Sequence, residues 1–497
     1  MSQNQAGICA VITEETMEAA RAALREAAAC ADLAEVRLDY LRDFDFTDPQ
    51  SLKKLLEDKT IPVIITCRAR SEGGRQMVAE DVRLRLLVEG AQWAEWCDIE
   101  YSSFDRVASL SPDYSRMIIS YHNFSETPAD LENIYAKLSL LPAAVCKIAT
   151  QANDFADSMT ILRLLDRAHG EGRKLIALAM GEAGVITRVM ALARGGFLTF
   201  GSLGQGRESA PGQLTCRELK QVYRVDYLSP KTTITGIIGK PVSHSASPAM
   251  HNAAYGALWL DFVYLPFEVD DLRKFFDTIR SEPMRGLSVT IPHKVAVMNF
   301  LDEIDETARK IGAVNTIVVR DGRFFGYNTD AAGAMGPLEK ICELEGESCA
   351  VLGAGGAARA VVYGLVERGA AVTVFARDLG RARPLTESFG VRVLPLAEFS
   401  ASDARIVINT TPLGMHGHSV GQSAVPRETL RGRSIAYDLV YNPLATRFLY
   451  DAKAEGCRII TGLEMLVFQA ALQFNLLTGF DVPVELMRRA AGERIDA

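Results

Sequence analysis

The 497-residue sequence lacks several features, and each absence narrows what the chain can be. It has no excess of positive charge. The formal net charge is −8, which argues against a surface for non-specific nucleic-acid binding. It contains no apolar run long enough for a transmembrane helix, so we expect no membrane partner. Its first residues show no basic segment followed by an apolar core, and we expect a cytoplasmic protein.

The sequence also lacks paired cysteine motifs, low-complexity tracts and short repeats. Its nine cysteines are scattered without CxxC spacing, so we expect neither a metal site nor a disulfide framework. What is present is typical of a globular protein, with 48% hydrophobic and 23% charged residues. The length predicts two to four domains, and the oligomeric state stays open.

The first ~220 residues alternate short apolar runs with longer amphipathic segments. Eight such runs with helical crossovers predict a (β/α)8 barrel over residues 1–224, although a sheet of another order remains an alternative. The runs cover residues 7–13, 34–40, 62–68, 96–101, 117–122, 144–150, 174–180 and 197–203.

Chemically varied polar residues lie in or just after these runs. Glu35, Arg37 and Asp39 alternate, which predicts that they share one face of a strand. Lys147 lies inside the apolar run AVCKIAT, where a neutral amine suits Schiff-base chemistry, but a lysine reaching solvent is the alternative. His122 is a candidate acid–base or a buried structural histidine. In a barrel, such strand ends build the active site.

After a polar linker at 225–232, the pattern predicts two α/β lobes. The first spans 233–332 and is completed by helices at 465–497; the second, at 333–464, contains GAGGAARA after the apolar run CAVL. This strand–turn–helix pattern with GxGxxA spacing is typical of dinucleotide binding in a Rossmann lobe, although a plain glycine turn is the alternative.

Several polar residues of the C-terminal half are candidate ligands. Ser245 and Ser247 precede a predicted helix, where Ser247 is expected to cap the helix with Pro248 in its first turn. Their hydroxyls also suit a carboxylate ligand. Lys294 and Asp330 follow predicted strands and suit proton transfer near a cofactor, with a structural salt bridge as the alternative.

The N-terminal motifs, in order, are AEVRLDYL, TCR followed by EGG, SYHNF, VCKIAT, AMGEAGVITR and SAPGQ. Together they resemble the type I 3-dehydroquinate dehydratases along the first ~220 residues. The resemblance implies that Lys147 forms an imine with the substrate ketone, that His122 transfers protons and that Glu72 orients His122. It implies substrate contacts from Glu35, Arg37, Arg68, Arg188, Ser209 and Gln213.

From residue 232 onward, HSASP, VTIPHK, AVNT, NTD, GAGGAARA, NTTPLGM, YDLVYNP and GLEMLVFQA resemble shikimate dehydrogenases. The resemblance implies Lys294 and Asp330 as the catalytic pair. It implies substrate contacts from Ser245, Ser247, Thr290, Asn315, Tyr441 and Gln469. Cofactor contacts are expected from Gly353, Ala354, Gly355, Gly356, Ala357, Arg377, Arg381, Thr410 and Gly462.

Two positions depart from that family pattern. Ser288 stands where single-function bacterial enzymes usually have asparagine. The usual Asn-Arg-Thr is replaced by Ala376, Arg377 and Asp378. Arg377 and Arg381 favour the 2′-phosphate of NADP, whereas Asp378 suits a free ribose hydroxyl, so we expect NADP with NAD as the alternative.

The two resemblances predict a bifunctional enzyme that dehydrates 3-dehydroquinate to 3-dehydroshikimate and then reduces this product to shikimate with NADPH. These small molecules are the expected partners. One alternative is a quinate/shikimate dehydrogenase fused to the dehydratase for quinate catabolism. The other is a non-catalytic homologue that senses ligands.

Overall fold

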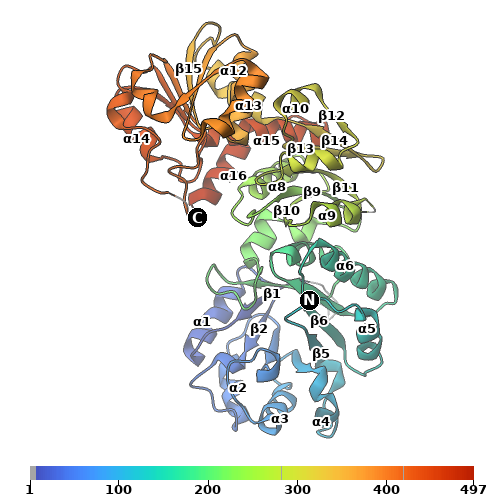
Figure 1. The fold of residues 1–497 in the computed structure, drawn as a ribbon. Helices are drawn as coiled ribbons and strands as arrows, with labels where there is room; N and C mark the ends of the chain where they lie inside the picture. The colour runs from blue at the N-terminus through green and yellow to red at the C-terminus, as the bar shows by residue number, and fades with distance from the viewer. Residues whose placement is uncertain (1–6, 281, 418, 497) are drawn as a thin grey trace. The chain divides into compact units, whose positions relative to one another are not determined.

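The computed structural model describes residues 7–280, 282–417 and 419–496 (Figure 1). The chain divides into two compact units, which we describe separately. The first contains Met1–Thr233 and Asp261–Thr278, and the second contains Ile234–Leu260 and Ile279–Ala497.

The first unit contains an eight-stranded parallel sheet with the order β7-β6-β5-β4-β3-β2-β1-β8. The N–H of Phe197, just before β8, donates to the carbonyl of Leu175 in β7 (2.8 Å), so the two ends of the sheet meet. This is the predicted barrel. Its strands are β1 (Gly7–Ile12), β2 (Leu33–Arg37), β3 (Val63–Thr66), β4 (Trp96–Glu100), β5 (Met117–His122), β6 (Val145–Gln151), β7 (Leu175–Met180) and β8 (Leu198–Ser202).

Helices alternate with these strands (Figure 1). They are α1 (Met17–Ala27), α2 (Pro49–Leu56), α3 (Glu80–Gly90), α4 (Phe104–Ala108), α5 (Leu131–Ser139), α6 (Phe155–Gly170) and α7 (Val185–Met190). In α1, the Thr16 side chain accepts from Ala19 N (3.2 Å) and caps the helix start. Its alanine and leucine side chains recur at helical spacing and are buried, as the sequence pattern predicts.

Branched apolar side chains fill the barrel interior, including Ile64, Ile118 and Ile176, with the aromatic ring of Phe200. One expectation needs correction. β2 ends at Arg37, and Asp39 lies in the 3-10 turn Leu38–Tyr40 rather than on the strand face. The segment Asp261–Thr278 of this unit carries β10 (Phe262–Glu268) and most of α9 (Leu272–Ile279).

The second unit begins with a mixed sheet in which β9, β11, β13, β14 and β12 are neighbours in that order. β9 and β11 are parallel, whereas β13 is antiparallel to both of its neighbours. The strands are β9 (Thr233–Gly239), β11 (Met284–Val289), β12 (Glu303–Ile304), β13 (Thr316–Arg320) and β14 (Arg323–Tyr327). Helices of this lobe are α8 (Ser247–Ala257), α10 (Glu306–Ile311) and α11 (Asp330–Glu339).

The second sheet of this unit is wholly parallel, with the order β17-β16-β15-β18-β19-β20. Counted along the chain this is 3-2-1-4-5-6, the Rossmann order. The strands are β15 (Ser348–Leu352), β16 (Ala371–Ala376), β17 (Arg392–Pro395), β18 (Ile406–Asn409), β19 (Ile435–Asp438) and β20 (Arg458–Ile460). The helices between them are α12 (Gly356–Val366), α13 (Leu379–Phe389) and α14 (Arg447–Ala454).

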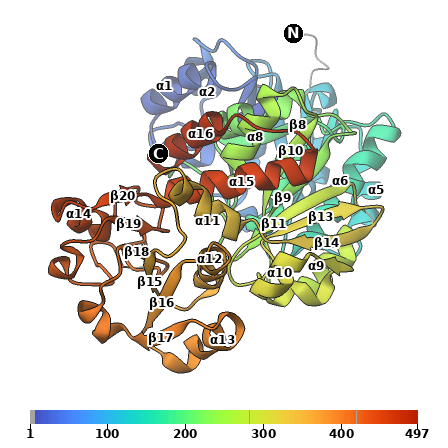
Figure 2. The same cartoon turned by 90° about the horizontal axis from the view of Figure 1, so that it is seen from above.

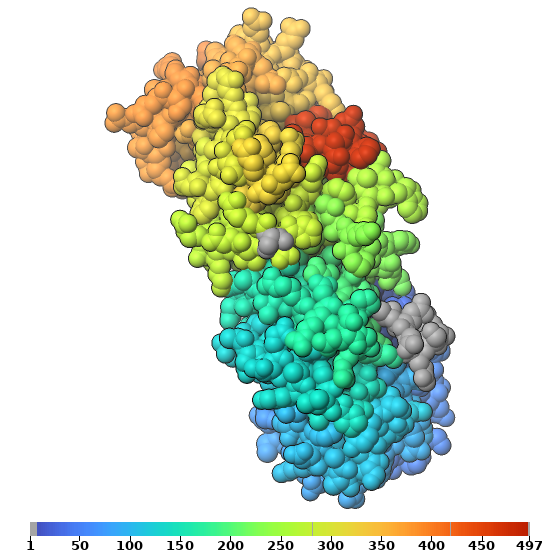
Figure 3. Space-filling view, turned by 90° about the vertical axis from the view of Figure 1, so that its right-hand side faces the viewer, coloured from blue at the N-terminus to red at the C-terminus, as the bar shows by residue number. Residues whose placement is uncertain are grey.

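The chain then returns to the first lobe of the same unit. α15 (Gly462–Thr478) hydrogen-bonds β11 and β13, as its apolar run predicts, and α16 (Val484–Asp496) lies beside α8 (Figures 2 and 3). Gly333 of α11 approaches the backbone of Gln469 in α15 so closely that an added Cβ would lie 3.0 Å from its Cα. Among the described residues we find no helix with the length and apolar character of a membrane span.

Candidate active sites

Lys147 is the centre of the barrel site. It lies within β6, its side chain is only 7% exposed, and its amine contacts two carboxylates. Nζ lies 2.7 Å from Oδ2 of Asp98 on β4 and 3.4 Å from Oε1 of Glu35 on β2. It also lies 4.5 Å from the ring centroid of Phe200 on β8. The amine therefore points into the barrel, and the alternative of a lysine reaching solvent is wrong.

Asp98 links Lys147 to a second buried cation. Its Oδ1 lies 2.9 Å from a guanidinium nitrogen of Arg68 and accepts from the Ser120 hydroxyl (2.7 Å). Burial opposes ionisation of this carboxyl, but the charges of Arg68 and Lys147 hold its pKa well below its ordinary value. Arg68 also lies 3.1 Å from Glu100, so the amine sits at one end of a buried charge network.

His122, the last residue of β5, lies against Glu72 with Nδ1 3.0 Å from Oε2. The Ser102 hydroxyl donates to the other oxygen of Glu72 (2.9 Å). Burial and then the positive charges of Arg68 and Lys147 lower the pKa of His122 well below 6.5. Burial also raises the pKa of Glu72. At neutral pH this imidazole is therefore a proton acceptor held by a carboxylate.

Arg188 on α7 is a buried cation for which the described part of the chain offers no anionic partner. Its side chain is 1% exposed, and among the described residues its Nε has no hydrogen-bond acceptor. One terminal nitrogen lies 3.4 Å from the carbonyl oxygen of Pro211. Burial lowers its pKa to about 10. Because an unpaired buried guanidinium is unfavourable, this position favours an anionic ligand.

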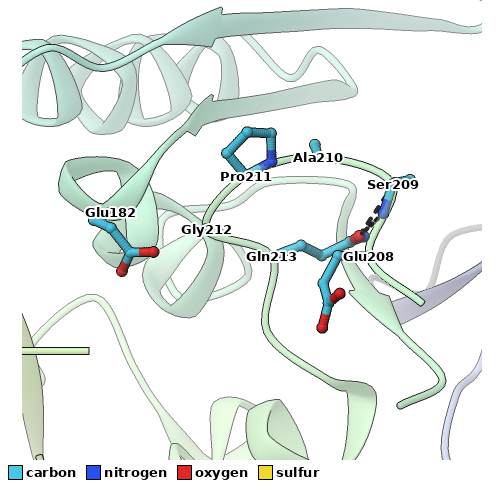
Figure 4. Close-up of a pocket in the computed structure, with 7 residues that line it drawn as sticks. All are labelled: Glu182, Glu208, Ser209, Ala210, Pro211, Gly212 and Gln213. Carbon is cyan, nitrogen blue, oxygen red and sulfur yellow. Dashed lines mark hydrogen bonds between the residues drawn. The ribbon is translucent and has the colours of Figure 1, made fainter. Parts of the chain in front are cut away.

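Ser209 and Gln213 hydrogen-bond to one another in the loop that follows β8 (Figure 4). Oε1 of Gln213 accepts from the Ser209 backbone N–H (2.7 Å) and hydroxyl (3.1 Å). The loop lines a pocket together with Glu182, whose side chain is drawn beside it in Figure 4. Pro211 of this loop contacts Arg188, so the loop borders the buried guanidinium.

The remaining predicted residues of this site have partners within the barrel. Arg37 makes a two-pronged ion pair with Asp39, both contacts at 2.9 Å. Glu35 accepts from the Thr66 hydroxyl (2.7 Å) as well as from Lys147. Asp39 therefore holds Arg37, although it lies outside the strand.

Asp98 is the residue that sequence reasoning missed. In WCDIEY it stands two residues before Glu100, so the alternation of a strand places both on one face. Both are fully buried, and both carry cationic partners. This alternation of two carboxylates within an apolar strand could have identified Asp98 from the sequence.

In the second unit, Lys294 and Asp330 form the predicted pair, with Nζ 2.5 Å from Oδ2. The side chains are 21% and 8% exposed. Asp330 is the first residue of α11, and its Oδ1 accepts from Nδ2 of Asn315 (2.8 Å). The carbonyl of Lys294 accepts from Val314 N (2.8 Å), which ties the two loops together. The structure thus brings Lys294, Asn315 and Asp330 together.

Ser245 and Ser247 lie at the start of α8, but the predicted cap is wrong. Ser247 is the first helical residue, Ala246 precedes it, and the helix start carries no side-chain cap hydrogen bond. Instead Oγ of Ser245 accepts from Ser247 N (3.2 Å). The helix begins one residue earlier than expected, and Ser245 accepts from the N–H of its first residue without acting as the cap.

Three further predicted residues come from different segments of this unit. Thr290 follows β11, and its N–H donates to Ile238 of β9 (2.9 Å). Gln469 on α15 is buried and donates to Leu466 of its own helix (2.8 Å). Tyr441 follows β19, and burial raises its pKa. Among the hydrogen bonds of the described residues, none joins these three side chains to Lys294 or Asp330.

The glycine turn after β15 lies at the point where the strand order reverses, between β15 and β18. Gly353 has φ +108°, and a Cβ there would lie 2.8 Å from the Thr410 hydroxyl. Added Cβ atoms at Gly355 and Gly356 would meet nothing within 4 Å. α12 starts at Gly356 without a side-chain cap, so its first N–H groups suit phosphate oxygens. These residues fit a dinucleotide.

The other predicted cofactor residues frame this turn. Thr410 donates its hydroxyl to the carbonyl of Leu352 (2.7 Å), and Ala354 and Ala357 are half-buried beside the glycines. Gly462 begins α15, where a Cβ would lie 2.5 Å from the carbonyl oxygen of Val440. This position therefore requires glycine for close packing.

The residues after β16 separate the two cofactor alternatives. Asp378 caps α13: its Oδ1 accepts from Arg381 N (3.1 Å). Its carboxylate is thus engaged by the helix start, while the side chains of Arg377 and Arg381 are exposed. Two exposed cations at this position favour the 2′-phosphate of NADP over an unmodified ribose.

Family comparisons match both units. Residues 8–230 match the family described as type I 3-dehydroquinase. Residues 237–317 match the shikimate dehydrogenase substrate binding domain, and residues 462–491 match the shikimate 5′-dehydrogenase C-terminal domain. Residues 348–434 match the family described as NADP oxidoreductase, coenzyme F420-dependent.

Two curated relatives cover different shares of the chain. A bifunctional 3-dehydroquinate dehydratase/shikimate dehydrogenase of Arabidopsis thaliana is 36% identical over 484 residues, 92% of this chain and 79% of that protein. A shikimate dehydrogenase (NADP(+)) of Pyrococcus abyssi is 46% identical over 264 residues, 53% of this chain and 98% of that protein.

Solved structures resemble the second half of the chain. A shikimate dehydrogenase of Thermus thermophilus in complex with NADP(H) and shikimate is 40% identical, with a TM-score of 0.50, covering 53% of this chain and 99% of its own. Another, in complex with NADP+, is 38% identical with a TM-score of 0.52, covering 54% of this chain and 97% of its own.

One expectation is overturned by these comparisons. The Arabidopsis relative is named as chloroplastic, which contradicts the cytoplasmic location expected from the sequence. The nine free cysteines of this chain fit any reducing compartment, and so they did not distinguish the cytosol from an organelle.

Proposed function

This chain belongs to the family of bifunctional 3-dehydroquinate dehydratase/shikimate dehydrogenases, and we propose that Lys147 and the Lys294/Asp330 pair carry out its two reactions. The chain is a multifunctional lyase and NADP-dependent oxidoreductase of the shikimate pathway. The observation that carries the proposed roles is the position of each amine. One is buried among carboxylates, and the other is paired with a single carboxylate beside a Rossmann lobe.

In the barrel, the neutral amine of Lys147 attacks the ketone carbon of 3-dehydroquinate, and water leaves as the imine forms. Asp98 and Glu35 lie within hydrogen-bond reach of Nζ and hold the amine in place beside the ketone. The imine draws electrons from the neighbouring carbon. His122, held by Glu72, removes the proton there and gives it to the departing hydroxyl, which leaves as water. Another water then hydrolyses the imine, which releases 3-dehydroshikimate and restores the Lys147 amine.

Arg188 supplies the binding of the substrate carboxylate. Its buried guanidinium has no anionic partner among the described residues, and 3-dehydroquinate carries one carboxylate. A forked hydrogen bond from Arg188 would satisfy both groups. The substrate hydroxyls find donors in Ser209 and Gln213, which lie in the loop that contacts Arg188. The ion-paired side chains of Arg37 and Arg68 supply further donors.

In the second unit, NADPH supplies the hydride for reduction of 3-dehydroshikimate when it is bound. Lys294 donates the proton that the substrate oxygen needs, and Asp330 holds the ammonium. The pyrophosphate is expected at the uncapped start of α12, where Gly355 leaves open space. The 2′-phosphate is expected at the exposed side chains of Arg377 and Arg381. Ser245, Ser247, Thr290, Tyr441 and Gln469 are the remaining proposed substrate contacts.

We assign the two reactions to the segments expected from the sequence. Dehydration belongs to residues 1–224, and 225–232 is a linker. The substrate lobe of the dehydrogenase is 233–332 with 465–497, and its NADP lobe is 333–464. The family matches at 8–230, 237–317 and 462–491 support this division.

A coupled assay tests the proposed roles. With 3-dehydroquinate and NADPH, absorbance at the nicotinamide band should fall, and shikimate should appear. Lys147→Ala should stop dehydration but not the reduction of added 3-dehydroshikimate, whereas Lys294→Ala should stop the reduction and leave the dehydration of 3-dehydroquinate intact. Failure of either variant to separate the two activities in folded protein would contradict the two-site assignment.

A further inference from the structure

A row of buried side chains behind the Lys294/Asp330 pair ends on the Asp330 carboxylate. Ser288 Oγ lies 2.8 Å from Gln473 Oε1, and Gln473 Nε2 lies 3.0 Å from Thr316 Oγ. Thr316 Oγ lies 2.8 Å from Asn315 Oδ1, and Asn315 Nδ2 lies 2.8 Å from Asp330 Oδ1. All five side chains are buried, and they come from strands β11 and β13, the start of α11, helix α15 and the loop before β13.

Backbone groups fix the orientation of both amides in this row. The N–H of Thr329 can only donate, and it lies 2.8 Å from one end of the Asn315 amide. That end must therefore be the oxygen, which leaves Nδ2 facing Asp330. The carbonyl of Asn315 can only accept, and it lies 3.1 Å from one end of the Gln473 amide. That end must be the nitrogen, which leaves Oε1 facing Ser288.

With the amides fixed, the two hydroxyls have one arrangement. Ser288 must donate to Gln473 because an amide oxygen only accepts. The Thr316 hydroxyl accepts a hydrogen bond from Nε2 of Gln473, so it donates its own hydrogen to Oδ1 of Asn315. Every donor in the row therefore points the same way, from Ser288 through Gln473, Thr316 and Asn315 toward Asp330.

We propose that Gln473, Thr316 and Ser288 are positioning residues that polarise Asn315 toward Asp330 and keep the Asp330 carboxylate ionised and aimed at Lys294. A hydrogen bond donated to a carboxylate favours its charged form. Aligned hydrogen bonds strengthen one another in a buried site. This inference rests on the proposed roles of Lys294 and Asp330.

The arrangement has a consequence for the reaction. Lys294 must be protonated to donate to the substrate oxygen, and an ionised Asp330 stabilises that ammonium. If the row is broken, the Asn315 amide is less firmly held and Asp330 accepts a proton more readily. The dehydrogenase should then lose turnover, and the acid limb of its rate should move to higher pH, while NADP binding in the other lobe is unaffected.

The decisive variant is Thr316→Val, which removes one hydroxyl and keeps the side-chain shape. We measure NADPH-dependent reduction of 3-dehydroshikimate by the full chain and normalise it to the dehydratase rate of the same sample. We expect kcat to fall about tenfold and the acid limb to move up by about one pH unit, with KM for NADPH unchanged. Thr316→Ser restores the hydroxyl and should recover most of the rate.

Thr235→Val is the matched control. Thr235 is also fully buried on a strand of the same sheet, and its hydroxyl lies 2.9 Å from that of Tyr255, away from the row. This change should leave kcat and the pH profile unchanged. Gln473→Glu is the second test. The introduced carboxylate has only acceptor oxygens, so the Thr316 hydroxyl should donate to it instead of to Asn315, and kcat should fall as in Thr316→Val.

The outcomes separate this inference from the proposed function. If Asp330→Asn leaves the reduction of 3-dehydroshikimate intact, the proposed role of Asp330 fails. If Asp330→Asn lowers the rate but Thr316→Val and Gln473→Glu stay within twofold of the parent, the inference alone is wrong. An equal loss in Thr235→Val would also overturn it. If Thr316→Val does not fold, Gln473→Glu and Thr316→Ser decide the question by their rates and pH profiles.

Discussion

The two proposed sites each place a lysine amine beside a carboxylate, yet their surroundings differ. Lys147 is 7% exposed and contacts two carboxylates, Asp98 and Glu35, which are themselves buried. Lys294 is 21% exposed, and its amine is paired with the Asp330 carboxylate. A lysine that forms a covalent imine must be held in one position facing the ketone, and the neighbouring carboxylates supply that hold. A lysine that donates a proton at each turnover must be recharged, which access to solvent permits.

The difference also predicts how each site tolerates change. Asp98 balances both Lys147 and Arg68, so removing its charge leaves two buried cations short of a partner. Breaking a buried ion pair from one side typically costs about 3–5 kcal/mol. Asp330 balances one partly exposed amine, so its removal should affect the reaction more than the fold. Variants of the amines themselves therefore give the clearest comparison.

The largest expected effect is that of Lys147→Ala. Without the amine no imine forms, and dehydration of 3-dehydroquinate should fall by about 10⁴-fold or more. Borohydride reduction in the presence of substrate should add mass to the parent protein and none to the variant. Reduction of 3-dehydroshikimate serves as the control and should stay within twofold of the parent. A mass increase in the variant would show that another amine forms the imine.

Lys294→Ala should have the next largest effect. Loss of a positioned proton donor typically costs about 10²–10⁴-fold, so kcat for reduction of 3-dehydroshikimate should fall by that amount. The KM for NADPH should hardly change, because the cofactor lobe is not altered. Steady-state rates at saturating NADPH measure the effect, and dehydration on the same chain is the control. If kcat fell less than about tenfold, Lys294 would not be the proton donor.

Arg188→Met should weaken substrate binding while stabilising the fold. The variant loses the forked bond to the carboxylate, so KM for 3-dehydroquinate should rise about 100-fold. It also removes a buried guanidinium whose Nε has no acceptor among the described residues, so Tm should rise by about 2 °C. Kinetics and calorimetry measure the two effects. A lower Tm in the variant would show that Arg188 has a partner in the free protein.

Arg381→Ala tests the cofactor preference. If its exposed guanidinium contacts the 2′-phosphate, KM for NADPH should rise about tenfold while KM for NADH stays unchanged. Arg383→Ala is a matched control, because Arg383 lies on the same helix, α13, and is paired with Glu387 (2.8 Å). An equal effect on both cofactors would mean that Arg381 does not contact the 2′-phosphate.

Local sequence patterns predicted the barrel strands and the glycine turn, because short apolar runs and strand–turn–helix spacing are local. Asp98 escaped prediction because its partners, Arg68 and Lys147, lie 30 and 49 residues away and meet it only when the barrel folds. The row from Ser288 to Gln473 joins positions 185 residues apart, and no local pattern reports it. The prediction that Ser247 caps α8 was wrong because the helix starts one residue earlier, and a sequence pattern does not fix a helix boundary to a single residue.

The smallest expected effect concerns the pH dependence of dehydration. Because burial and neighbouring cations lower the pKa of His122 well below 6.5, the imidazole is still neutral at pH 6.5. As pH falls from 7.5 to 6.5, kcat/KM limited by this base should therefore change little, and it should decline only at lower pH. An imidazole with an ordinary pKa would lose about half its neutral form at pH 6.5. A half-loss at that pH in the parent, absent from the residual rate of His122→Ala, would show that His122 is not shielded as the buried site implies.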